Sequence, residues 1–122
     1  MTVPVEVCLK GEDYASNESI SGIPREPKSW TDADVRLVLE GMLQALHRKK
    51  HPSSPDQPVA LRGFSWIVNP FETGGVVIAL EMTVGAVVAG PFDVSESALS
   101  GLIERAMAAD RTAMAGQSRT IH

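Results

Sequence analysis

The chain has 122 residues, of which 43% are hydrophobic and 21% charged, which suits one globular domain, residues 1–122, with a core of its own. Its formal net charge of −4 argues against general nucleic-acid binding, which depends on clustered Lys and Arg at phosphates. The single cysteine, Cys8, excludes an internal disulfide, and the N-terminus has no signal-peptide pattern, so we expect a cytoplasmic protein.

The N-terminal part of the chain predicts one strand followed by an irregular segment. Residues 3–9 alternate apolar and other side chains, which is typical of a half-exposed strand. Pro4 cannot donate a backbone hydrogen bond and favours an edge position or the start of a strand. Residues 10–30 are rich in Gly, Ser, Asn, Pro and charge, and they predict an extended surface segment.

The next segment predicts a helix. Thr31 is a suitable N-cap, and an apolar stripe follows it at helical spacing. We expect the helix to end near His51, because a residue before proline avoids the helical region. Gly41 in its middle costs about 1 kcal/mol relative to alanine and suggests close approach of a strand or another helix.

A hairpin is predicted between residues 59 and 90. Residues 59–68 form its first strand, and because both faces of that strand are partly apolar we expect it to be central or to lie between two layers. After a turn-rich loop, residues 76–90 alternate again. They form either one long strand with a bulge at Gly85 or two strands, and two are favoured because fifteen residues is long for one. The run 74–90 is too short, and carries Glu81 too centrally, for a membrane-spanning helix.

The C-terminal part predicts a second helix. Asp93 as N-cap and Glu96 three residues later resemble a capping box. The helix is expected to end at about Ala109 or as late as Ala115, with residues 116–122 as a disordered tail. These elements predict an α+β fold in the order β-loop-α-β-β-β-α, with an antiparallel sheet of three to four strands and two helices packed on one face.

No cofactor or metal is expected. His47 and His51 lie four residues apart near a helix end and share one face, as two ligands of a zinc site would. The sequence offers no third ligand, and complementation of the helix dipole explains both residues. Cys8 has Glu6 and Glu12 near it in sequence, and these acidic neighbours disfavour the thiolate that a nucleophile needs.

Glu81 is the one charge between Glu72 and Asp93, within an apolar strand. If it were buried without a partner, its pKa would rise and it would be a candidate general base. The competing interpretations are a solvent-facing position on a one-sided sheet, an ion pair with Arg62, or a charge that blocks edge pairing.

The leading hypothesis for function is a non-enzymatic protein-binding or assembly module that acts as a homodimer. The strands contain more apolar surface than two helices can cover, and uncovered apolar patches mark interfaces. Phe64, Trp66 and Phe71 are the candidate anchors, since aromatic residues often carry binding energy. The alternative is a small-ligand-binding protein or enzyme with a pocket between sheet and helices that includes Arg62 and Glu81. No nucleic-acid or membrane partner is expected.

Overall fold

The computed structural model describes residues 1–53 and 59–120, with the backbone alone for residues 110–120. Five strands and two α-helices follow one another along the chain. They are β1 (Val3–Leu9), β2 (Ser16–Ile20), α1 (Asp32–Lys50), β3 (Ser65–Pro70), β4 (Val76–Met82), β5 (Gly85–Phe92) and α2 (Glu96–Thr120), with a short 3-10 helix, η1 (Pro27–Ser29), before α1.

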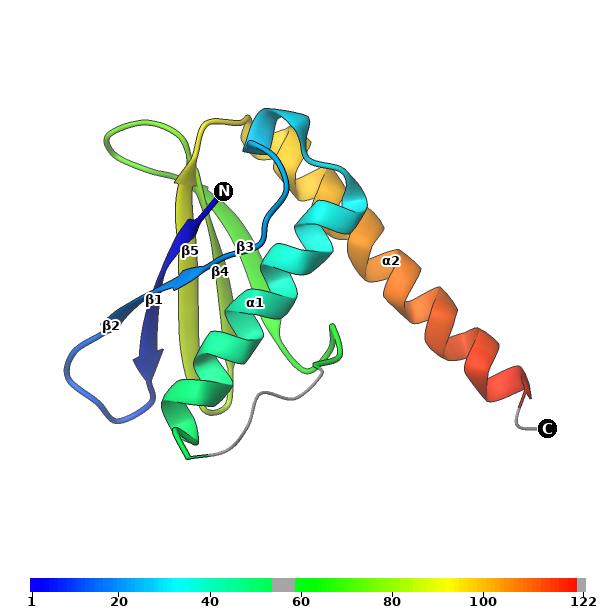
Figure 1. Cartoon of the computed structure of the whole chain (residues 1–122), viewed down its shortest axis with the longest axis horizontal. Coiled ribbons are helices and arrows are strands. Elements are labelled where there is room, and N and C mark those ends of the chain that lie inside the picture. Colours follow the sequence, from blue (N-terminus) through cyan, green and yellow to red (C-terminus); the bar gives the residue numbers. More distant parts are fainter. Residues whose placement is uncertain (54–58, 121–122) are drawn as a thin grey trace.

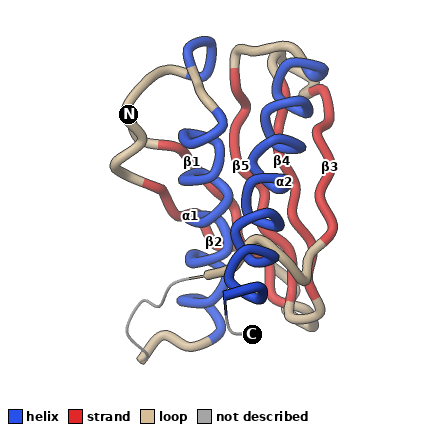
Figure 2. The backbone as a smooth tube through the Cα atoms, turned by 90° about the vertical axis from the view of Figure 1, so that its right-hand side faces the viewer, coloured by secondary structure: helices blue, strands red, loops and turns tan. Residues whose placement is uncertain are grey.

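The strands form one antiparallel sheet in the order β2-β1-β5-β4-β3. Both helices cover the same face of this sheet, with α1 near β1 and α2 near β4 and β3 (Figures 1 and 2). The predicted α+β class is therefore confirmed. The predicted number of strands is too low, because the sheet has five strands and not three to four.

The additional strand is β2, which lies within the segment 10–30 that the sequence predicts as extended surface chain. Its sequence, SNESI, has a single large apolar residue, Ile20, so it carries no alternating signal. Backbone pairing with β1 defines it, with Ile20 opposite Val3 and Glu18 opposite Val5. This pairing makes β1 an internal strand, in which Pro4 lies near the start, as proline requires.

The first helix begins and ends where the sequence predicts. Thr31 is its N-cap, and its hydroxyl accepts a hydrogen bond from the backbone N–H of Asp34 at 3.3 Å. The Asp34 carboxylate accepts one from the Thr31 N–H at 2.9 Å, which completes a capping box. Asp34 is buried and also pairs with Arg25 at 3.2 Å. His51 is the C-cap.

The hairpin that precedes β5 differs from the prediction at its first strand. β3 begins at Ser65, so residues 59–64 are not part of the sheet, and β3 lies at an edge and not in a central position. The prediction of a central strand depended on apolar residues on both faces of residues 59–68. One of these residues, Ile67, is 51% exposed. Residues 76–90 form two strands, as favoured, with the turn at residues 83–84.

The second helix begins two residues later than a cap at Asp93 requires. Ser95 caps it, because its hydroxyl accepts a hydrogen bond from the Ala98 N–H at 3.2 Å. Asp93 instead pairs with Lys28 at 3.1 Å on the surface. The helix continues to Thr120, so residues 116–120 of the predicted tail are helical, while residues 121–122 lie outside the described part.

The core lies between the sheet and the two helices. It is built from one face of every strand and from the apolar stripes of both helices. Its largest fully buried side chains include Ile23, Leu39, Met42, Leu46, Leu61, Ile78, Leu80, Leu99 and Ile103.

Candidate functional site

The face of the sheet opposite the helices is covered by no described element (Figures 1 and 2). Alternation along each strand decides which side chains it carries. The apolar ones outside β1 form what we call the open-face strip, and they come from β3, the β3–β4 loop, β4 and β5. Its members are Ile67, Phe71, Val77, Ala79, Ala86 and Val88.

Strand register aligns the centre of this strip. Ile67 in β3 is opposite Ala79 in β4, and Ala79 is opposite Val88 in β5. Three apolar side chains therefore cross three adjacent strands in one row. The row ends at Glu6 of β1, which is opposite Val88. The next row carries Glu81, so two carboxylates border the strip.

Phe71 lies at the end of the strip where the β3–β4 loop meets the sheet. Its side chain is 43% exposed. Together with Val77, Val88 and Pro91 it lines a shallow hollow of about 270 Å³. An exposed aromatic ring beside a hollow is a feature that a partner side chain can use.

The other two candidate anchors lie on the opposite side of the sheet. Trp66 is opposite Leu80, a core residue, and both Trp66 and Phe64 are half-buried and pack against the core. Of the three aromatic residues that the sequence singles out, Phe71 alone belongs to the open-face strip.

Glu81 and Arg62 are not brought into one pocket. Glu81 is exposed on the open face, opposite Ser65 and Ala86. Arg62 lies on the helix-covered side, in the segment between α1 and β3, and it lines a groove beside α1. The surroundings of Glu81 are those of a solvent-facing residue on a one-sided sheet.

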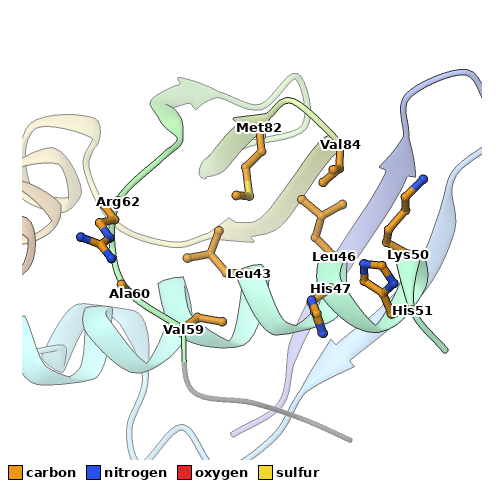
Figure 3. A pocket seen from close by; sticks show the side chains of 10 residues that line it. All are labelled: Leu43, Leu46, His47, Lys50, His51, Val59, Ala60, Arg62, Met82 and Val84. Carbon is orange, nitrogen blue, oxygen red and sulfur yellow. The ribbon is translucent and has the colours of Figure 1, made fainter. Parts of the chain in front are cut away.

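That groove lies between the C-terminal half of α1, residues 59–62 and the β4–β5 turn (Figure 3). Its volume is about 370 Å³. Apolar side chains from all three segments form its floor, and its polar residues are basic or imidazole-bearing. Sequence reasoning missed it because no one segment carries its pattern.

His47 and His51 lie next to each other in this groove, with ring centroids 4.9 Å apart. Within the described residues, no group of three or more His, Cys, Asp or Glu side chains could hold a metal ion. The Nε2 atom of His47 is buried and has no hydrogen-bond partner there.

Comparisons with protein-family models, with curated proteins and with solved structures find no match to this chain. Among the described residues, no helix has both the length and the apolar character needed to cross a membrane. The function must therefore be argued from the open-face strip and the groove.

Proposed function

We propose that the chain is a non-enzymatic protein-binding module that self-associates as a homodimer through the open-face strip. The observation that carries this proposal is the aligned row of Ile67, Ala79 and Val88 across the uncovered face of the sheet. Apolar surface that is removed from water contributes about 25 cal/mol per Å². Contiguous patches of this kind mark interfaces.

A second copy suits the shape of this face. Two sheets can pack face to face about 10 Å apart, and a twofold axis then brings the same strip together from both subunits. Ala79, in the central row of the strip, permits close approach there, and Ala86 lies in the next row, opposite Glu81. Glu6 and Glu81 lie at its borders, where they can stay in water.

The size of the face limits how much surface a dimer can bury. Five strands about 4.8 Å apart and about 23 Å long span roughly 550 Å² in projection. Stable interfaces bury about 800 Å² on each partner. We therefore expect a reversible dimer whose population depends on concentration, and not an obligate one.

Sedimentation velocity over a range from about 1 µM to about 1 mM tests this proposal. The variant Ile67→Glu adds a carboxylate to the centre of the strip and is expected to abolish the dimer. Leu37→Glu is the matched control, because Leu37 is 45% exposed on α1, in the helical layer on the other side of the sheet. A wild-type protein that stays monomeric throughout, or an unchanged dimer of the Ile67 variant, would overturn the proposal.

A further inference from the structure

The groove beside α1 is a second apolar surface, separate from the open-face strip. Its floor consists of Leu43 and Leu46 of α1, Val59, and Met82 and Val84 at the β4–β5 turn (Figure 3). Val84 is 37% exposed, so this floor is open to solvent on one side. A volume of about 370 Å³ falls within the range of small-molecule sites.

The charges around this floor have one sign. Lys50 and Arg62 carry these positive charges beside the imidazoles of His47 and His51, and no carboxylate lines the groove, although the chain as a whole has a net charge of −4. Figure 3 shows Arg62 at one end of the groove and the other three at the opposite end. The groove therefore combines an apolar centre with basic ends.

Helix-dipole complementation explains only part of this arrangement. Basic residues in the last turn of α1 are stabilised by the partial negative charge of the helix C-terminus. Arg62 lies outside the helix. Four other arginines in the described part of the chain pair with a carboxylate, whereas Arg62 has no such partner there. The pairs are Arg25–Asp34, Arg36–Glu40, Arg48–Glu18 and Arg105–Asp32.

His47 provides a second, independent observation, because a polar atom at this end of the groove lacks a hydrogen-bond partner. A buried polar atom normally has a hydrogen-bond partner, and leaving it without one is unfavourable. No described residue supplies a partner to its Nε2 atom. Because the atom is shielded from solvent in this structure, the imidazole has to turn towards the groove before a group from outside the chain can become its partner.

We infer that the groove binds a small amphipathic anion. Its carboxylate occupies the end formed by His47, Lys50 and His51, and its apolar tail lies over Leu46, Val59 and Met82. Charge-assisted hydrogen bonds to the carboxylate give orientation, and burial of the tail gives affinity. Arg62 adds to the positive potential that attracts the anion. This site and the proposed self-association occupy opposite sides of the sheet and do not depend on each other.

Titration of the ¹⁵N-labelled full chain with octanoate, followed by heteronuclear NMR, tests this inference. Octanoate has both a carboxylate and an apolar tail, whereas acetate lacks the tail and octanol lacks the charge. We expect saturable shifts for octanoate at Leu46, His47, Val59 and Val84. The expected dissociation constant is on the order of 1 mM, as befits a ligand of this size. Acetate and octanol should bind at least about tenfold more weakly, which corresponds to about 1.4 kcal/mol.

Two charge reversals on adjacent residues provide the matched comparison. Lys50 lines the groove and Lys49 does not, yet both lie in the last turn of α1. Lys50→Glu is expected to weaken octanoate binding about tenfold, since it places a carboxylate beside the ligand head. Lys49→Glu changes the net charge equally and is expected to weaken binding less than about threefold, because solvent screens a more distant charge.

Three results would overturn the inference. Octanoate shifts that never saturate would exclude a site. Equal affinity for octanol would exclude recognition of the anion. If Lys50→Glu and Lys49→Glu weakened octanoate binding equally, the overall charge of the protein and not the groove would attract the anion.

Discussion

The side chain of Ile20 in β2 occupies the space that a Cβ atom on Gly41 of α1 would need. A Cβ built on Gly41 lies 2.7 Å from Cγ2 of Ile20 and 3.0 Å from its Cδ1. The glycine in the middle of the helix thus permits α1 to approach the edge strand of the sheet, which accounts for a residue that is unfavourable in a helix.

The contact between Gly41 and Ile20 predicts that Gly41→Ala destabilises the wild-type protein but stabilises a variant with a smaller residue 20. Gly41→Ala alone should destabilise the protein by about 1 kcal/mol, because steric overlap with a stiff β-branched side chain outweighs the gain in helix propensity. In an Ile20→Ala background the same change should stabilise by about 0.5–1 kcal/mol, since the propensity gain then acts alone. Urea denaturation of the four proteins in this cycle measures both values. The same sign in both backgrounds would contradict the steric explanation.

The buried Asp34 predicts a large effect at the start of α1. Asp34→Ala removes the acceptor of the Thr31 N–H and the partner of Arg25, so we expect a loss of about 2–3 kcal/mol in the free energy of unfolding. Asp32→Ala is the control in the same helical turn. Asp32 pairs with Arg105 in a solvent-exposed position, and its removal should cost less than about 1 kcal/mol. Equal losses for the two variants, measured by urea denaturation, would show that the capping box is unimportant.

The two sides of the sheet predict different effects for two aromatic residues. Trp66→Ala should lower the free energy of unfolding by about 2 kcal/mol, because the indole packs against the core, and should leave self-association unchanged. Phe71→Ala should cost less than about 1 kcal/mol in stability. It should weaken the dimer about tenfold, because a symmetric interface loses two copies of the ring.

Thermal unfolding and sedimentation velocity on the same preparations separate these effects. If a Trp66→Ala variant folded normally but no longer dimerised, Trp66 would be part of the dimer interface. A Phe71→Ala variant that dimerises like the wild type would remove Phe71 from it.

Some features of the fold could be predicted because they depend on neighbouring residues alone. Thr31 and the acidic first turn determine where α1 begins, and the His51–Pro52 step determines where it ends. The predicted alternation between Val76 and Met82 is present in β4, where Val76, Ile78 and Leu80 are buried and the residues between them are not.

Other features could not be predicted, because pairing between distant segments determines them. β2 is defined by its register on β1, and its own sequence carries almost no apolar signal. The sequence pattern of residues 59–68 could not reveal that the strand begins at Ser65, nor that β3 lies at an edge. The sequence hypothesis placed Arg62 and Glu81 in one pocket. In the structure they lie on opposite sides of the sheet.

Local patterns in the sequence predict the fold class, the bounds of α1, the presence of a second helix near the C-terminus and the alternation of β1 and β4, because helix caps and side-chain periodicity are local properties. The tertiary structure decided the strand order, the uncovered face and the groove beside α1. These arise where segments far apart in the sequence meet. Only the packing of both helices on one side of the sheet leaves Ile67 and Phe71 exposed together.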